Sequence, residues 1–434
     1  METEKLNYTK RTIDDMESDV SYMIRQQLSQ GLNDGGMLSF RVPADPSRFT
    51  DLNVCMLKLE VSIETVDGAT PPLASPACLD DQGMHAIFSS CDLRLNEKLV
   101  STMQNYPYTA KLCRMLGMSQ GLREGVFDTL DGTRKPSLKK SNLESDEDAA
   151  KRTILMNMAR AQKRAILIGR IYSDVLMSCR QLLPPGVAIG IDLRRAPDEF
   201  SLMSCVAAAS TYKLKITNAS LYLRRMKLRP SLQTRAMESV KAGACLTFNR
   251  LETRLIGVPK ESKVFRWLNC LNNAALPNRL YITFVSQKSL YGSVLKNSTY
   301  FEHNFVSRIT VRLNGRDIMV EPITSSFEVG DDGDLNLNKS QAMGGFYSLT
   351  EILDQVRDPT MPLRLGYNDY LMGNVVYALE LGKCGEKSTT TGAIDIEAHF
   401  LRTENRQNAG TSEAMLMMLM TEKTEEVEAS PQSI

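Results

Sequence analysis

The sequence predicts an all-β protein made of two tandem sandwiches, and three observations lead to this prediction. The 434 residues exceed what one hydrophobic core usually holds and suit two domains of about 200 residues each. Apolar and polar residues alternate over many short segments, which is the pattern of strands with one buried face. Two pairs of similar segments also recur in the same order, at an offset of roughly two hundred residues.

Residues 1–35 are predicted to form a helical arm ahead of the first sandwich. Thr12 and Asp15 can form a capping pair, and Gly31 can end the helix. The apolar residues that recur there at helical spacing are Ile13, Met16, Val20, Met23, Ile24 and Leu28. An apolar stripe on an isolated arm usually marks a partner surface, so we expect the arm to dock onto a neighbouring molecule.

From Gly36 onward the hydrophobic period changes to two. The clearest alternating segments are 38–42, 57–63, 280–285 and 394–400. Each predicts a strand with one buried and one wetter face. Clusters of Pro, Gly and Asp separate these segments as turns. Many short strands joined by long loops favour sandwiches.

Two further segments stand out from this pattern. Ser145–Arg164 opens with acids and closes with bases, which suits a helix dipole. Together with the polar stretch Leu130–Asn142, it is interpreted as a long insertion between strands. Met415–Met420 (MLMMLM) indicates a last core strand, with an exposed apolar patch as the alternative.

The internal repeat consists of two pairs of segments. DLRLNEKLVS (Asp92–Ser101) resembles TVRLNGRDIM (Thr310–Met319), and both predict a strand, a tight turn at the Asn and a second strand. ILIGRIYSDVL resembles YLMGNVVYALEL around Gly169 and Gly373. Two similar β domains explain both pairs, and chance similarity of short β patterns is the alternative.

The repeat divides the chain into four parts. Residues 36–212 are predicted to form the first sandwich and residues 213–421 the second, with the boundary near Tyr212–Pro230. The arm of residues 1–35 precedes them. Residues 422–434 are acidic and are predicted to be a disordered tail.

Composition limits the cellular compartment and the kinds of binding partner that the protein can have. The formal net charge is +1, so no global excess of base draws the chain onto nucleic acid or anionic membranes. The N-terminus lacks the apolar core of a signal peptide, and no apolar run is long enough to span a bilayer. The nine cysteines form no CxxC pair, which predicts free thiols in a reducing compartment.

A search for catalytic or ligand-binding patterns predicts no enzyme, no cofactor and no metal site. The three histidines, His85, His303 and His399, are too far apart in sequence to suggest a metal pair. No phosphate-binding loop, dinucleotide fingerprint or nucleophile elbow occurs. The run 332–336 begins like a calcium loop but lacks its later glycine and acid, which favours an acidic turn.

One stretch without acidic residues concentrates positive charge. The functional interpretation is contact with nucleic acid through its phosphates. A solvated strand edge or a subunit contact is the structural interpretation, which we favour. The residues are Lys213, Lys215, Arg224, Arg225, Lys227, Arg229 and Arg235.

An ordered set of segments resembles the double jelly-roll major capsid proteins of Polinton/Maverick elements and adintoviruses. Leu182–Met203 followed by Tyr212–Leu232 is similar to the central signature of that family. Further segments that resemble the family in its order are Gly35–Pro43, Phe49–Ile63, Phe88–Leu116, Leu276–Phe305 and Ile309–Ile318. The resemblance spans roughly residues 32–420 and leaves out the insertion and the tail.

The resemblance implies two eight-stranded jelly rolls with helical loop insertions. It also implies hexon-like homotrimers that form pseudo-hexagonal capsomers in the icosahedral shell of a double-stranded DNA virus or virus-like transposon. The implied partners are neighbouring trimers and minor or penton capsid proteins, with packaged DNA touched non-specifically at most. No small-molecule substrate or catalytic residue is implied. The protein would reside in the virion after synthesis in the host cytoplasm or nucleus, without secretion.

Other classes of protein remain as alternatives. A jelly-roll module that binds carbohydrate or protein would hold its ligand in loops, but Trp267 is the single tryptophan and no calcium loop is present. A β-sandwich enzyme such as a cupin would need a histidine cluster that the sequence lacks. A domesticated host copy of a capsid gene would show the same sequence features.

Overall fold

A computed structural model describes the fold over most of the chain. The described residues are 18–29, 36–68, 77–122, 128–132, 164–179, 181–204, 212–243, 245–259, 262–272, 274–319, 321–328, 340–353, 364–382, 390–401 and 414–428. The predicted helix Ser145–Arg164, except for its last residue, and most of the insertion Leu130–Asn142 lie outside them.

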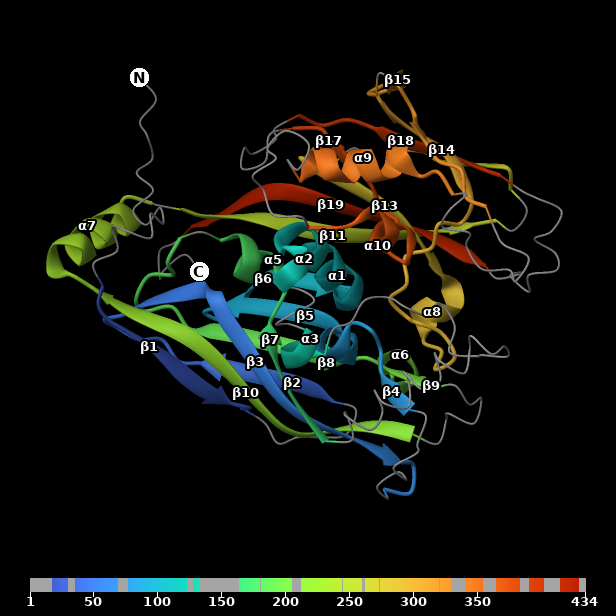
Figure 1. Ribbon diagram of the computed structural model, residues 1–434. Coiled ribbons are helices and arrows are strands. Elements are labelled where there is room, and N and C mark those ends of the chain that lie inside the picture. Colours follow the sequence, from blue (N-terminus) through green and yellow to red (C-terminus); the bar gives the residue numbers. More distant parts are fainter. Residues whose placement is uncertain are drawn as a thin grey trace, which may run out of the picture.

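The first jelly roll is a sandwich of two antiparallel four-stranded sheets (Figure 1). One sheet has the order β1 (Ser18–Gln27), β10 (Tyr212–Leu228), β3 (Phe49–Thr65) and β7 (Arg164–Arg170). The facing sheet has the order β2 (Met37–Val42), β8 (Ile189–Arg195), β5 (Phe88–Leu95) and β6 (Lys98–Gln104). A separate short pair consists of β4 (Ala77–Leu79) and β9 (Leu202–Ser204).

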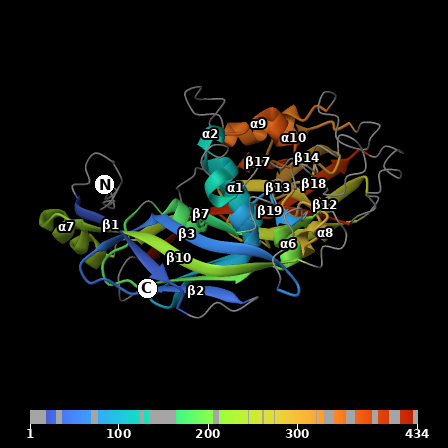
Figure 2. The ribbon, with the colours of Figure 1, turned by 60° about the horizontal axis from the view of Figure 1, so that its bottom comes forward.

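The second jelly roll repeats this plan, and Figure 2 shows it beside the first. One sheet has the order β11 (Cys245–Val258), β19 (Met415–Glu428), β13 (Arg279–Ser286) and β17 (Tyr377–Glu380). The other has the order β12 (Val264–Trp267), β18 (Ile394–Phe400), β14 (Val306–Leu313) and β15 (Arg316–Asp317), and β16 (Ile323–Thr324) also pairs with β14.

The two sandwiches have the same topology. When the eight principal strands of each are numbered along the chain, both sandwiches have sheets of order 1-8-3-6 and 2-7-4-5. Thus β1 corresponds to β11, β6 to β15, and β10 to β19. The predicted fold class, two tandem eight-stranded jelly rolls, is confirmed.

Helices occupy the connections between strands. They are η1 (Gly83–Ile87), α1 (Tyr106–Gly117), α2 (Gln120–Leu122), α3 (Asp128–Asp131), α5 (Asp174–Ser178), α6 (Asp198–Ser201), α7 (Pro230–Lys241), α8 (Gln287–Tyr291), α9 (Met343–Ile352) and α10 (Tyr367–Leu371). α1 and α9 lie in equivalent connections, between the fifth and sixth principal strands of their jelly rolls.

Alternating burial accounts for most strands. In β3, Leu57 and Leu59 are buried in the first core, whereas Lys58 and Glu60 on the opposite face are half-buried. β19 departs from alternation because Met417–Met420 are buried throughout. The MLMMLM segment is therefore a core strand, as predicted.

The predicted N-terminal helix is wrong over Ser18–Gln27, where the chain forms β1. Residues 20–27 pair with β10 in antiparallel register, and Ile24 and Leu28 pack against the first core. These apolar positions fit a strand face as well as a helix stripe. Backbone hydrogen bonds to β10 decide between the two, because tertiary pairing overrides local propensity. Residues 1–17 lie outside the described residues, and the first jelly roll begins before residue 36.

The predicted boundary at 212/213 is also wrong. β10 pairs with β1 and β3 of the first jelly roll, and its residues Leu214, Leu221 and Leu223 belong to the first core. α7 then leads to β11, which starts the second jelly roll. A strand that closes one sheet has the same alternating pattern as a strand that opens the next, so periodicity does not separate them.

The acidic tail starts later than predicted, because β19 continues to Glu428. Its carboxylates lie next to arginines of the neighbouring strands. Glu425 lies 3.0 Å from Arg250 and Glu422 lies 3.9 Å from Arg279. The prediction of disorder is therefore wrong for residues 422–428, and the rest of the tail lies outside the described residues.

The two predicted hairpins occupy equivalent places. Their turns lie at Asn96 and Asn314, which both adopt the left-handed conformation, with φ of 47° and 51°. Each backbone amide donates to an alanine carbonyl, Ala188 or Ala393, at 2.9 and 2.8 Å. Each Asn side chain accepts a bond from the amide of that same alanine, at 2.8 and 2.9 Å. The two jelly rolls therefore close their hairpins with the same pair of reciprocal bonds.

The paired glycines, in contrast, are not equivalent. Gly169 lies inside β7, where a Cβ would come within 2.9 Å of the Asp131 side chain. Gly373 precedes β17, has a φ of +77° and packs against the ring of Tyr300. Gly169 lies within β7 and Gly373 lies before the equivalent strand β17, so a different steric reason favours glycine at each position.

Candidate assembly surfaces

The described residues contain no group of three or more His, Cys, Asp or Glu side chains that could hold a metal ion. His85 is buried beside Asp131, His303 stacks on an aromatic ring, and His399 bonds to Glu397. A hollow of about 210 Å³ beside β19 is smaller than the ~300–1,000 Å³ of typical ligand pockets.

A separate question is whether a helix could span a membrane. No helix among the described residues is long and apolar enough to do so.

Helix α1 lies at the centre of the contact between the two jelly rolls (Figure 1). Tyr106 and Ala110 belong to the first core. Tyr108, Leu112 and Met115, on other sides of the helix, belong to the second core. One helix thus joins both cores, and the buried apolar surface holds the jelly rolls together.

A buried polar network joins loops of both jelly rolls beside α1. Lys111 donates from Nζ to the carbonyl oxygens of Thr299, at 2.7 Å, and Gly373, at 2.5 Å. The Asp80 carboxylate accepts bonds from the Thr299 hydroxyl, at 2.9 Å, and the Ser298 amide, at 3.0 Å. Burial raises the pKa of Asp80, although these hydrogen bonds and Lys111 oppose the rise. Lys111 is only 2% exposed, so its charge depends on these partners.

The outer edge of β11 is covered by side chains of the first jelly roll. Ser178, at the end of α5, accepts a bond from the Asn249 amide at 2.7 Å. Gln181 accepts a bond from the Thr247 amide at 2.7 Å and donates to the Cys245 carbonyl at 3.1 Å. An edge strand normally leaves such groups unpaired. Here the neighbouring jelly roll satisfies them.

The corresponding surfaces on β1 and α9 lack such cover among the described residues. The backbone pairing of β1 runs to β10 on one side, and Met23 is 46% exposed. On α9, Met343 and Tyr347 lie one turn apart and are 63% and 52% exposed. Exposed apolar side chains of this size indicate contact surfaces when they cluster.

A second buried cluster holds α3 against the first jelly roll. Asp131 Oδ2 lies 3.5 Å from His85 Nε2 and 3.6 Å from Arg114 Nη2. The Tyr106 hydroxyl lies 3.1 Å from His85 Nδ1. Burial lowers the pKa of His85 and outweighs the opposing effect of Asp131. The ring is therefore neutral near pH 7.

Each jelly roll carries one carboxylate between two arginines on the outer face of a sheet. The contacts, at 2.7–3.4 Å, are Asp192 with Arg41 and Arg94, and Glu397 with Arg266 and Arg312. Burial opposes ionisation of both carboxylates, but the hydrogen bonds outweigh it and lower their pKa values. Sequence analysis does not identify these residues, because pairing across strands depends on register.

Three of the seven predicted basic residues are held by carboxylates along β10. The pairs are Lys215 with Glu64 at 3.3 Å, Arg224 with Asp51 at 3.8 Å, and Arg225 with Asp45 at 3.4 Å. β10 lies between β1 and β3, so the interpretation of this stretch as a strand edge is wrong.

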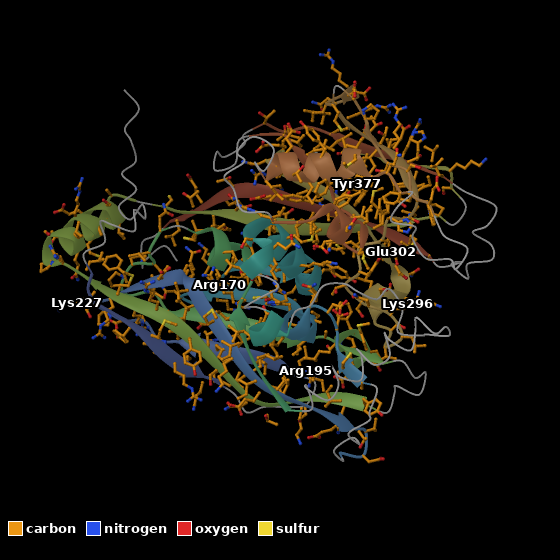
Figure 3. All side chains as sticks on the ribbon, viewed as in Figure 1. Arg170, Arg195, Lys227, Lys296, Glu302 and Tyr377 are labelled. Atoms are coloured by element: carbon orange, nitrogen blue, oxygen red, sulfur yellow. The ribbon has the colours of Figure 1, made fainter. Side chains whose placement is uncertain are left out.

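The other four basic residues lie at the two ends of the stretch. Lys213 is half-buried and faces Glu64 in the adjoining strand. Lys227, Arg229 and Arg235 are exposed where β10 runs into α7, and Figure 3 shows Lys227 at that end of the molecule. The predicted stretch is therefore not one continuous basic face.

No family model matches this chain, and no curated protein matches it. Solved structures do share its fold. A chain of the Sputnik virophage, solved by electron cryomicroscopy, gives a TM-score of 0.60 at 8% identity, covering 95% of this chain and 87% of its own. The Faustovirus major capsid protein gives 0.53 at 7% identity, with coverages of 94% and 90%. VP54 of PBCV-1, fitted into a Sputnik reconstruction, gives 0.50 at 10% identity, with 94% of each chain covered. These neighbours are double jelly-roll major capsid proteins.

Proposed function

We propose that this chain is a structural major capsid protein whose homotrimers form pseudo-hexagonal capsomers in an icosahedral shell around double-stranded DNA. The observation that carries the proposal is the packing of two jelly rolls with the same strand order in one chain. Three copies around a threefold axis would place six similar sandwiches in a ring. Such a block tiles a hexagonal lattice, and its cyclic symmetry closes the contacts.

The resemblance of the sequence to Polinton/Maverick and adintovirus proteins leads us to propose a virus or virus-like transposon of that kind as its source. In this role the protein would reside in the virion and contact neighbouring trimers and minor or penton proteins. It would act by assembly rather than by catalysis.

Size-exclusion chromatography with light scattering tests the proposal on the full-length chain. We expect a stable species with the mass of three chains, and hexagonal outlines in electron micrographs. An obligate interface of this kind should bury about 2,000–5,000 Å². A protein that remains monomeric at high concentration would overturn the proposal.

A further inference from the structure

The two hairpin turns differ chemically although their hydrogen bonds are the same. Each turn has a clamp, which is the pair of reciprocal bonds between the turn Asn and the alanine ahead of the neighbouring strand. Glu97 follows Asn96 in the first turn, whereas Gly315 follows Asn314 in the second. This is the single Asn-Gly pair in the whole sequence.

A glycine after an asparagine favours a spontaneous reaction of the side-chain amide. The backbone nitrogen of the glycine attacks Cγ of the asparagine, a cyclic succinimide forms, and Nδ2 leaves as ammonia with the proton of the attacking nitrogen. One water molecule then opens the ring and yields aspartate, or isoaspartate, in which the main chain runs through the former side chain. A following residue with a Cβ obstructs the attacking nitrogen, which glycine leaves open. Asparagine is among the thermolabile residues of proteins.

The second turn gives solvent access to both reacting groups. Asn314 and Gly315 are exposed, and a Cβ on Gly315 would meet no described atom within 4 Å apart from its chain neighbours. Figure 1 shows β15, the strand after this turn, at the outer end of the second jelly roll. Water can therefore reach the reacting carbon, and the turn has room to change its conformation. In the first turn Asn96 is half-buried.

The second hairpin is also held by fewer backbone bonds than the first. β14 and β15 form two ladder pairs, and the Ile318 amide adds one bond to the Val311 carbonyl at 3.1 Å. β5 and β6 form six ladder pairs, and Arg94 Nη1 also donates to the Glu97 carbonyl at 3.3 Å. Segments with few such bonds open locally at a lower free energy than well-paired ones. The second turn therefore leaves its clamp, and reaches the reactive geometry, more often than the first.

We propose that Asn314 is a site of spontaneous deamidation, with water as the co-reactant, and that its isoaspartyl product opens the clamp of the second jelly roll alone. Isoaspartate lengthens the main chain of the turn by one carbon atom, so the bond from the Ala393 amide is lost. The aspartyl product keeps an acceptor oxygen there and adds one negative charge to the turn. Asn96 retains its amide, so the two equivalent turns age differently. This inference does not depend on the shell function.

Incubation of the full-length protein at mildly alkaline pH, in water enriched in heavy oxygen, tests the proposal. Mass spectrometry of peptides should find aspartate and isoaspartate at position 314, each with one heavy oxygen atom from ring opening. Conversion of Asn96 should be at least about 10-fold slower, because each additional hydrogen bond makes an open turn about fivefold rarer. The chain unfolded in urea, where Asn314 should also convert, confirms that the peptide is detected. An Asn314 that stays intact in the folded protein, or equal rates at the two turns, would overturn the proposal.

The reciprocal exchanges Gly315→Glu and Glu97→Gly separate the effect of the following residue from that of the fold. Glu97 has a φ of 66°, so a glutamate is compatible with such a turn, and a glycine there is free of strain. Gly315→Glu should abolish the conversion of Asn314. Glu97→Gly should speed the conversion of Asn96, but to a rate below that of Asn314 in the wild type.

Circular dichroism confirms that these variants fold. Gly315→Asn replaces Gly315→Glu if the latter does not, because asparagine tolerates a positive φ. Continued conversion of Asn314 in the folded variant would overturn the succinimide route.

Hydrogen exchange of the aged protein tests the structural consequence. The Ala393 amide should exchange at least about fivefold faster in the isoaspartyl form, because it has lost its acceptor. The Ala188 amide, which donates to Asn96, is the matched control and should exchange as in fresh protein. An unchanged rate at Ala393 would overturn the opening of the clamp.

Discussion

The two jelly rolls of this chain have the same strand order and differ in how their first strands are covered. β11 has its edge bonded to Ser178 and Gln181 of the other jelly roll. β1 pairs with β10 and has no such partner among the described residues. The two jelly rolls thus have equivalent edges, and among the described residues the chain itself satisfies only that of β11. The fold is therefore complete inside one chain, whereas among the described residues its set of edge contacts is not.

The hairpin turns of the two jelly rolls have the same hydrogen bonds. The Asn96 and Asn314 side chains accept matching bonds from the amides of Ala188 and Ala393, each of which directly precedes a strand. The arginine contacts have diverged slightly, because Arg266 lies directly opposite Glu397 in the ladder, whereas Arg41 lies diagonal to Asp192.

The largest effect is expected from breaking the junction between the jelly rolls at Lys111. Lys111→Met should lower the free energy of unfolding by about 3–5 kcal/mol, because it removes a buried cation and leaves Asp80 and two carbonyls without that partner. Urea unfolding followed by circular dichroism measures the loss. The transition should also broaden or split, since the two jelly rolls would no longer unfold together.

Lys241→Met, at the exposed end of α7, is the matched control and should unfold like the wild type. A loss below about 1 kcal/mol in Lys111→Met would contradict the role given to this network.

The Lys111 network also shows which features of the structure can be predicted from the sequence and which cannot. Alternation over residues 57–63 and the Asn-Gly turn at Asn314 depend on local order, so strands, hairpins and the duplicated fold were predictable. The interdomain contacts of Lys111 and Gln181 join residues far apart in sequence, and a single lysine or glutamine has no local pattern. β1 was mistaken for a helix because its apolar spacing fits both periods and only its partner strand decides.

A smaller, pH-dependent effect is expected from His85, which is fully buried in the first jelly roll. Its pKa in the folded state is lowered, so the unfolded chain takes up the proton first as the pH falls. The stability that depends on the neutral ring is complete above about pH 6.5. It is lost below that value at about 1.4 kcal/mol per pH unit, until the folded state also binds the proton.

His85→Asn should therefore flatten the fall in stability between about pH 7 and pH 5, measured by urea unfolding at several pH values. The raised pKa values of buried Asp80 and Asp174 act in the opposite direction, but they are common to both proteins and cancel in the difference. His399→Asn, which removes a half-buried histidine that bonds to Glu397 in the second jelly roll, gives a comparison with a histidine outside the buried cluster. Parallel curves for wild type and His85→Asn would contradict the prediction.

The same substitutions at both sites test whether the two hairpin clamps are equivalent. Asn96→Gly and Asn314→Gly keep the left-handed turn and remove one hydrogen bond, so each should cost about 1 kcal/mol. The alanine variants add strain of about 1–2 kcal/mol at a positive φ. Thermal unfolding should rank alanine below glycine at both positions, and a different order at one site would show that the clamps have diverged.

The smallest effect is expected at the exposed basic residues where β10 meets α7. The sequence analysis found no similar basic stretch in the second jelly roll. Replacing Lys227, Arg229 and Arg235 with alanine should leave stability unchanged within about 0.5 kcal/mol. If these cations touch packaged DNA, binding of duplex DNA should be weak and salt-dependent. In the triple variant the slope of log affinity against log salt should then fall by about 1 per cation removed.

The matched control replaces exposed bases of the second jelly roll, namely Lys263, Arg308 and Arg316. An equal change in both triple variants would mean that net charge alone governs binding. A slope that changes in neither would assign these residues to a subunit contact or to the solvated surface, because neither role needs phosphate.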